Sequence, residues 1–171
     1  EEGVRNAIRM IKESGADAVK LEGGEEVLPV IRHTVQAGVP VVGHLGLTPQ
    51  SVNQFGGYGL RAKGGAEAEK LLHDARLLDE AGCCAIVLEK IPAALAAEVT
   101  RQVSCPVIGI GAGNGTDGQV LVLHDMLGLN QGFKPKFLRH FAELGNEVKN
   151  AVGTYISAVK DTTFPNAEES Y

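Results

Sequence analysis

Tryptophan is absent from this 171-residue sequence, aromatic residues make up only 5%, and no long apolar run occurs. The longest apolar runs, Cys83–Leu88 and Pro106–Ile110, fall far short of the roughly 20 residues that a membrane-spanning helix needs. The 16 Lys and Arg against 21 Asp and Glu give a net charge of −5, with no basic stripe among aromatics. We therefore expect neither nucleic acid nor membrane as a partner. A cytoplasmic location is expected, since Glu1–Gly3 lacks the regions of a secretory signal.

Cysteine is scarce as well, with Cys83, Cys84 and Cys105 inside or beside apolar runs. Adjacent residues of a strand point to opposite faces, so a disulfide between Cys83 and Cys84 is geometrically poor. The pair also lacks the C-x₂-C spacing of common zinc sites. We expect buried free thiols and no metal at these cysteines.

One unit repeats along the chain: an amphipathic helix, a glycine or small polar residue, then a short apolar run rich in branched residues. The pattern predicts strands over Ala16–Gly23, Val41–Gly46, Cys83–Glu89, Pro106–Gly111 and Gln119–Asp125. It predicts helices over Val4–Ser14, Glu25–Gln36, Ala66–Glu80, Ala93–Gln102, Pro135–Leu144 and Asn146–Val159, and a long loop over Leu47–Gly65. We expect one partial barrel domain over residues 1–171, with a polar tail at Asp161–Tyr171.

Helices that alternate with apolar strands indicate right-handed crossovers and a parallel sheet. Two α/β architectures accommodate five such strands: an open doubly wound sheet, and a barrel that needs eight strands and about 250 residues. The pattern alone leaves both open. In either fold, ligands gather at the carboxyl ends of the strands.

Polar residues occur at several of these strand ends. Lys20 and Glu22 are two residues apart, so they share one face of the first strand, and they are costly to bury without a purpose. His44 ends the second strand; a satisfied core histidine is an equally good interpretation. Glu89 follows the apolar run Ala85–Leu88, a setting that suits a general base, although a solvent-facing glutamate would have the same sequence.

Two further strand ends give weaker indications. The glycine-rich Gly109–Gly113 could cradle a phosphate, but it lacks the full G-x-G-x-x-G pattern, and close backbone packing explains it as well. His124 and Asp125 would cap the last strand, with no catalytic role assigned.

Taken together, these segments resemble the ketopantoate hydroxymethyltransferase family. The matching stretches are Val19–Gly24, Val42–Ser51, Phe55–Tyr58, Leu88–Glu89, Ile108–Gly113 and Asp117–Asp125. The resemblance implies an α/β fold consisting of the C-terminal five βα units of a (β/α)₈ TIM-type barrel. It also implies transfer of a hydroxymethyl group from 5,10-methylenetetrahydrofolate to 3-methyl-2-oxobutanoate, on the route to pantothenate and coenzyme A.

The resemblance further implies roles for four residues. Glu89 matches the proton acceptor, Lys20 matches a residue that binds the 2-oxo acid, Glu22 matches a magnesium ligand, and His44 lies in a motif near the substrate. Mg²⁺ as cofactor, folate as co-substrate and a ring-forming homo-oligomer follow from the same resemblance. The chemistry suits these residue types, because Mg²⁺ prefers oxygen ligands and a 2-oxo acid offers two.

The sequence departs from the family at its start, where nothing matches the first third and its two metal-binding aspartates. Three missing strands, at roughly 30 residues per βα unit, account for the difference. We accordingly expect the chain to be inactive or badly impaired by itself unless a separate segment completes it. Two alternatives remain: a magnesium-dependent lyase or mutase barrel acting on a 2-oxo acid, and a non-catalytic barrel remnant that binds a partner.

Overall fold

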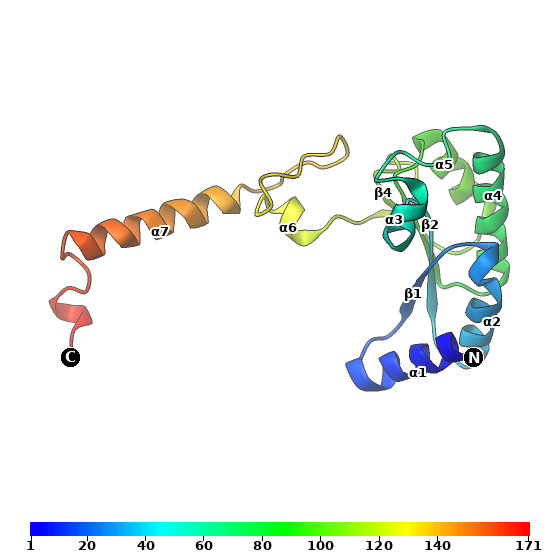
Figure 1. The fold of residues 1–171 in the computed structure, drawn as a ribbon, viewed down its shortest axis with the longest axis horizontal. Helices are drawn as coiled ribbons and strands as arrows, with labels where there is room; N and C mark the ends of the chain where they lie inside the picture. Colours follow the sequence, from blue (N-terminus) through cyan, green and yellow to red (C-terminus); the bar gives the residue numbers. More distant parts are fainter. The chain divides into compact units, whose positions relative to one another are not determined.

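Five parallel strands form one sheet in the computed structural model, which describes all of residues 1–171 (Figure 1). They are β1 (Val19–Glu22), β2 (Val41–Gly46), β3 (Ala85–Glu89), β4 (Val107–Ile110) and β5 (Gly118–Gln119). The strands lie in the order β1-β2-β3-β4-β5, and every neighbouring pair is parallel. An open doubly wound sheet reverses its strand order at a switch point. The sequential order here has no reversal, as in a barrel.

The helices cover one face of this sheet. They are α1 (Glu2–Ser14), α2 (Leu28–Gln36), α4 (Gly65–Glu80) and α5 (Ala93–Gln102), and α2 and α4 lie on the same side of β1 and β2 (Figure 1). The strand residues on that face are fully or almost fully buried: Val19, Val41, Leu45, Ile86, Leu88 and Val107. They form the core with Ile31 of α2 and Leu78 of α4.

The opposite face of the sheet is only half-buried, as its apolar residues Val42, Val87, Ile108 and Ile110 illustrate. A sheet with helices on one face and an open second face is a segment of barrel wall, since a doubly wound sheet carries helices on both faces. The prediction of an α/β fold that comprises five βα units of a TIM-type barrel is therefore confirmed.

Local sequence explains where these elements begin and end. Helix α1 ends at Gly15, whose φ of 71° is the left-handed conformation that glycine adopts most easily. A single 3-10 turn, η1 (Glu25–Val27), precedes α2, and Pro29 lies in the first turn of α2, where its missing N–H costs nothing. The bounds of β2 and α5 are those the pattern predicts.

Two predicted elements were wrong. The fifth strand covers only Gly118–Gln119, because β4 ends at Ile110 and offers no further partner beyond the bond from Val120 N to Gly109 O. His124 and Asp125 instead lie in the short helix α6 (Leu123–Met126). The helix predicted over Pro135–Leu144 is absent. The backbone there bonds instead to the C-terminal end of α6, through Phe141 N to Met126 O and Leu144 N to Leu127 O.

Two other predictions hold only in part. The segment predicted as a long loop contains one 3-10 turn, η2 (Pro49–Ser51), and one helical turn, α3 (Val52–Phe55). All three cysteines are free, but only Cys83 is buried, while Cys105 is intermediate and Cys84 is exposed. Burial raises the pKa of the Cys83 thiol to about 11, and burial together with Asp79 raises that of Cys105 to about 12.

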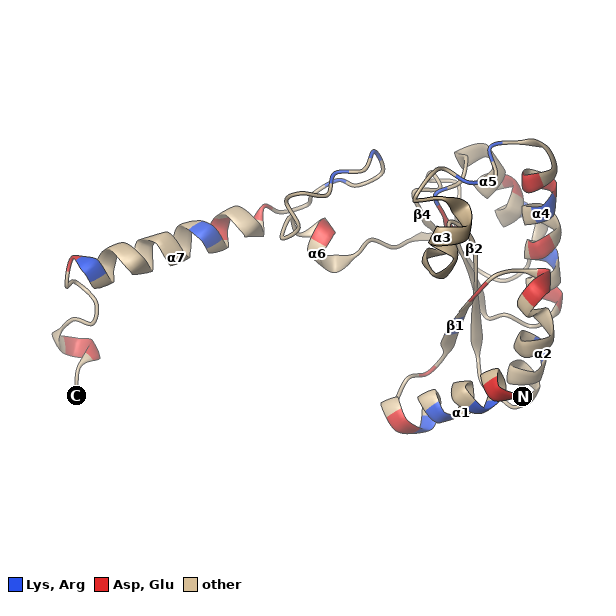
Figure 2. Ribbon diagram, viewed as in Figure 1, with Lys and Arg blue, Asp and Glu red and all other residues tan.

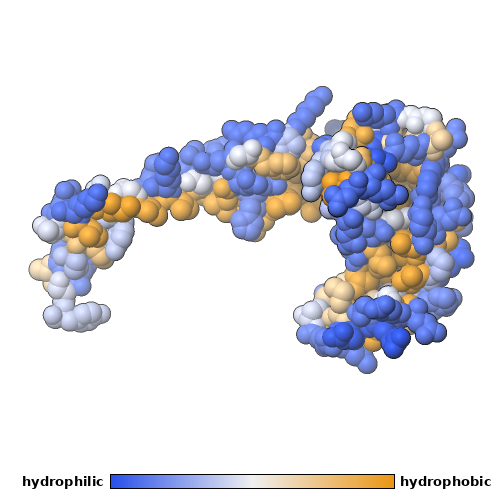
Figure 3. Space-filling model, viewed as in Figure 1, coloured by the Kyte–Doolittle hydropathy of each residue, from blue (hydrophilic) through white to orange (hydrophobic).

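The chain divides into two units, Glu1–Val120 and Leu121–Tyr171. The second contains α6, α7 (Leu144–Lys160) and the turn η3 (Ala167–Glu169), and none of its apolar side chains is buried. Along α7, Val148, Val152, Ile156 and Val159 are between 44% and 55% exposed, and Figure 3 shows apolar residues at the surface of this unit. The single domain predicted over residues 1–171 stays a prediction.

Acidic and basic side chains are interspersed along the helices, as on α1 and α4 in Figure 2. On α1, Arg9 and Glu13 form an exposed pair one turn apart, with 3.0 Å between Nε and Oε1. Such pairs stabilise the folded state by about 0.3–0.5 kcal/mol. None of the helices combines the length and hydropathy needed to cross a lipid bilayer.

Thr34 of α2 gives a first stability prediction. Its side chain is fully buried, and its hydroxyl has no hydrogen-bond partner. Because valine has nearly the same shape and no hydroxyl to leave unpaired, Thr34→Val should keep or raise the free energy of unfolding, by up to about 1 kcal/mol. The matched control is Thr100→Val on α5, which removes a 2.8 Å bond from Oγ1 to Ala96 O and should cost about 1 kcal/mol. Urea unfolding followed by circular dichroism measures both; a larger loss at Thr34 than at Thr100 would contradict the assignment.

Candidate functional site

The structure brings all four predicted site residues together on the open face of the sheet. Lys20 and Glu22 come from β1, His44 from β2 and Glu89 from β3. In the strand register Glu22 pairs with His44, and Gly46 pairs with Glu89. Because the strands are parallel, their carboxyl ends meet at one edge, which places side chains from three segments far apart in sequence in one cluster.

His44 lies at the centre of this cluster. Its Nδ1 is 3.1 Å from Lys20 Nζ and 3.6 Å from Glu22 Oε1, and its Nε2 is 3.3 Å from Glu89 Oε2. Lys20 Nζ also donates to Glu22 Oε1 at 3.2 Å. The His44 ring is almost fully buried, with 3% of its side chain exposed, so these neighbours are its polar environment.

The contact with Lys20 assigns the tautomer of His44. A lysine ammonium can only donate, so Nδ1 must accept, and the proton of the neutral ring is then on Nε2. That N–H faces the Glu89 carboxylate. The 3.3 Å separation is within reach of a hydrogen bond, but the angles are not those of one, and Nε2 is buried without a partner. The ring therefore lies beside Glu89 without a hydrogen bond that fixes the two side chains together.

The Glu22 carboxylate is more deeply buried than that of Glu89, with 7% of its side chain exposed against 19%. Its Oε2 accepts a bond of 2.9 Å from the backbone N–H of Gln50 in η2. Mg²⁺ binds proteins through one or two carboxylates and keeps water and substrate oxygens as its other ligands. Glu22 fits as one such ligand. Nowhere in the chain do three or more His, Cys, Asp or Glu side chains form a complete metal site.

Glu89 sits where β3 turns away from the sheet. Its side chain is 19% exposed, so the carboxylate is in contact with solvent. Its backbone carbonyl accepts a 2.8 Å bond from Leu47 N. Gly46, at φ 90°, passes so close that a Cβ there would lie 2.7 Å from Ile91 Cγ2 and closer still to the Glu89 carbonyl oxygen. Tight backbone packing between the ends of β2 and β3 thus fixes the position of Glu89.

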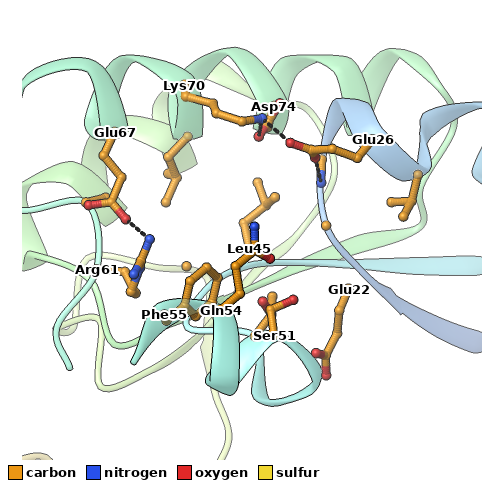
Figure 4. A pocket seen from close by; sticks show the side chains of 17 residues that line it. Glu22, Glu26, Leu45, Ser51, Gln54, Phe55, Arg61, Glu67, Lys70 and Asp74 are labelled. Atoms are coloured by element: carbon orange, nitrogen blue, oxygen red, sulfur yellow. Dashed lines mark hydrogen bonds and ion pairs between the residues drawn. The ribbon is translucent and has the colours of Figure 1, made fainter. Parts of the chain in front are cut away.

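A cavity of about 400 Å³ adjoins the cluster and shares Glu22 with it (Figure 4). Six charged side chains contribute to its wall: Glu22, Glu26, Arg61, Glu67, Lys70 and Asp74. Lys70 Nζ lies 2.9 Å from Glu26 Oε1 and 2.7 Å from Asp74 Oδ2. On the opposite side, Arg61 pairs with Glu67 and stacks 3.8 Å over the Phe55 ring.

The ion pairs of the cavity wall shift two pKa values. The hydrogen bond from Lys70 lowers the pKa of Glu26. Burial works against the charge of Lys70, but its bonds to Asp74 and Glu26 outweigh burial and raise the pKa of the ammonium. Both groups therefore stay ionised at neutral pH, and the wall beside α4 is held by fixed charges.

Sequence reasoning missed this cavity. Asp74 was the available indication, because it lies on α4 among the buried Leu71, Ala75 and Leu78 and is itself buried. A carboxylate inside an apolar stripe needs a partner, and Asp74 finds two, Lys70 Nζ and the backbone N–H of Glu25 at 3.1 Å.

The glycine-rich Gly109–Gly113 is explained by close packing. A Cβ on Gly113 would lie 3.0 Å from the Cα of Ala93, and one on Gly109 would lie 2.8 Å from Thr116 Oγ1. No helix begins directly after this segment, since β5 is the next element, so the helix N-terminus that a phosphate cradle requires is missing.

The family model described as ketopantoate hydroxymethyltransferase matches residues 1–167. The 3-methyl-2-oxobutanoate hydroxymethyltransferase of Parabacteroides distasonis is 59% identical over 171 residues, covering 100% of this chain and 63% of that protein. The proteins of the same name from Bacteroides fragilis (strain ATCC 25285) and Flavobacterium johnsoniae are 58% and 57% identical over 99% and 100% of this chain, and 62% and 63% of their own lengths.

Among solved structures, the YdjI aldolase from Escherichia coli K12 aligns with 71% of this chain and 50% of its own, at 14% identity and a TM-score of 0.43. The chain spans about 63% of the length of the curated relatives it matches. A family model that covers residues 1–167, together with relatives 57–59% identical along the whole chain, shows that this chain belongs to the ketopantoate hydroxymethyltransferase family.

Proposed function

We propose that this chain carries the proton-abstracting part of a hydroxymethyltransferase. The reaction joins 3-methyl-2-oxobutanoate to the one-carbon unit of 5,10-methylenetetrahydrofolate and gives ketopantoate, on the route to pantothenate and coenzyme A. Family membership supports this proposal. The observation that carries it is the position of Glu89, whose Oε2 lies 3.3 Å from His44 Nε2 in a cluster with Lys20 and Glu22.

The chemistry of the substrate makes a base the first requirement. The proton on C3 of the 2-oxo acid is adjacent to a ketone, and the Glu89 carboxylate would accept it. His44 Nε2–H faces that carboxylate across 3.3 Å and would donate to it after a small rotation of either side chain. Water adds to the one-carbon unit as both of its bonds to the folate nitrogens break, and each nitrogen takes up a proton. The electron pair left on C3 then adds to the released carbon, which is at the oxidation level of formaldehyde, and the oxygen from water takes up the proton that Glu89 removed and becomes the new hydroxyl.

Lys20 and Glu22 would handle the other end of the substrate. Lys20, 45% exposed at its side chain, can swing from Glu22 toward the substrate carboxylate and bind it through charge-assisted hydrogen bonds. Glu22 would hold Mg²⁺ as one ligand, with the substrate oxygens and water as others. When bound, Mg²⁺ polarises the ketone and makes the neighbouring proton more acidic. Further protein ligands would come from the third of the relatives that this chain does not span.

We also propose that the complete protein forms a homo-oligomer and acts in the cytoplasm. Family membership is the support for both. Two alternatives remain open. A lyase or mutase barrel would cleave or rearrange its 2-oxo acid without consuming folate, and a non-catalytic remnant would do neither.

Proton exchange tests the proposal. The chain is fused behind the N-terminal third of the Parabacteroides distasonis relative, and the loss of the C3 proton of 3-methyl-2-oxobutanoate in D₂O is followed by NMR. We expect exchange that depends on Mg²⁺, and formation of ketopantoate once 5,10-methylenetetrahydrofolate is added. If the fused protein folds but exchanges the proton no faster than buffer with Mg²⁺ does, the proposal is wrong.

A further inference from the structure

Lys90, the residue directly after Glu89, joins three separate parts of the chain. Its backbone N–H donates to Ile110 O at 2.8 Å, at the end of β4. Its carbonyl accepts from Arg61 N at 2.9 Å, and its ammonium donates to the carbonyl oxygen of Tyr58. One residue thus connects β3, β4 and the segment between α3 and α4.

Its backbone conformation is unusual as well. Lys90 has a φ of 50°, in the left-handed region, which costs a residue with a Cβ about 1–2 kcal/mol. Glycine would adopt this conformation without that cost. In this conformation the lysine side chain makes one hydrogen bond, to Tyr58 O.

The segment that Lys90 holds is residues 56–62, which we call the cover segment. It begins at Gly56, where α3 ends with a φ of 72°, and ends at Ala62, which is 2% exposed and part of the core. Between these points, the backbone of residues 58–61 makes two hydrogen bonds, and both are to Lys90. Tyr58 itself is 64% exposed, so packing does little to hold it.

The cover segment also forms a wall of the cavity. Arg61 and Ala62 line it, next to Phe55, on which Arg61 stacks. The segment is thus bonded on one side to the residue after Glu89 and on the other, through Arg61 and Glu67, to α4.

We propose that Lys90 is a positioning residue that ties the cover segment to the strand end carrying Glu89, and so sets the position of this wall of the cavity. The inference rests on the bonds of Lys90 and stands whether or not the proposed reaction is correct.

Limited trypsin digestion of the 171-residue chain tests this tether. We expect trypsin to cut after Arg61 faster when the cover segment leaves Lys90, because the bond from Arg61 N to Lys90 O holds the cleavage site in place. A Lys63→Gln background removes the competing site nearby. The readout is the initial rate of cleavage after Arg61 divided by that after Arg76, which lies inside α4 and reports unfolding of the whole unit. Lys90→Met keeps the aliphatic stem but cannot donate, Lys90→Arg can still donate to Tyr58 O, and Lys12→Met on α1 is the matched control.

We expect Lys90→Met to raise the ratio about tenfold, because a hydrogen bond from a charged group is lost and cleavage follows the population of the open form. Lys90→Arg should stay within about twofold of the parent, and Lys12→Met should not change the ratio. The tether is refuted if Lys90→Met leaves the ratio unchanged, if cleavage after Arg61 and Arg76 rises equally, or if Lys90→Arg behaves as Lys90→Met does.

Discussion

Glu89→Gln is expected to slow exchange of the C3 proton of 3-methyl-2-oxobutanoate by about 10²–10⁴-fold in the fused protein, the range of a general base. Glutamine has the size and shape of glutamate but cannot accept the proton. The carboxamide still fits beside His44 Nε2, which is 3.3 Å from Oε2 in the parent, and can accept its N–H. Substrate binding should therefore change little while proton removal nearly stops.

Two measurements separate this effect from misfolding. The dissociation constant of the 2-oxo acid with Mg²⁺, measured by calorimetry, should stay within about threefold, because Glu89 acts on the proton and not on the bound carboxylate. Glu13→Gln, an exposed carboxamide exchange on α1 paired only with Arg9, should leave the exchange rate unaltered. An unchanged exchange rate in Glu89→Gln would remove Glu89 from the mechanism.

Gly46→Ala should be the most destabilising substitution at the site edge, lowering the free energy of unfolding by about 2–5 kcal/mol. A methyl group at φ 90° costs about 1–2 kcal/mol. Overpacking against the Glu89 carbonyl and Ile91 adds about 1–3 kcal/mol. The displaced β3 end should also slow proton exchange. Urea unfolding monitored by circular dichroism gives the stability loss.

Gly38→Ala is the matched control for that substitution. Gly38 has a φ of 83°, close to that of Gly46, but an added Cβ would meet nothing within 4 Å. Gly38→Ala should therefore lower the free energy of unfolding only by the cost of a left-handed backbone conformation for alanine, about 1–2 kcal/mol. Equal losses at both positions would show that close approach to Glu89 contributes nothing, and that the packing account of this edge is incorrect.

The site was predictable from sequence because it depends on simple rules. Polar residues at the ends of apolar strands, Lys20, Glu22, His44 and Glu89, stand out against their surroundings. Parallel strands bring such ends to one edge. In a parallel sheet with sequential strand order, the register of β1, β2 and β3 then places these side chains next to one another. The roles of these four residues stay predictions.

The failures have a common cause in non-local contacts. The apolar run after Gln119 has the composition of a strand, but a strand needs a partner with free backbone groups, and β4 ends at Ile110. The helix predicted at Pro135–Leu144 does not form, because backbone N–H groups of this segment donate to the carbonyl oxygens of Met126 and Leu127. The cavity was missed because its walls come from the loops after β1 and β2 and from α4, which no spacing rule connects.

By itself, then, the sequence determined the alternation of strand and helix, the parallel sheet, and which polar residues end the strands, since each depends on neighbours within a few positions. Only the tertiary structure decided that α1, α2, α4 and α5 cover one face of the sheet, that Lys20 sets the tautomer of His44, and that Lys90 holds the cover segment. The contacts of Lys20 with His44 and of Lys90 with Tyr58 join residues 24 and 32 positions apart. A chain's local pattern carries no information about the angle and distance at which such segments meet.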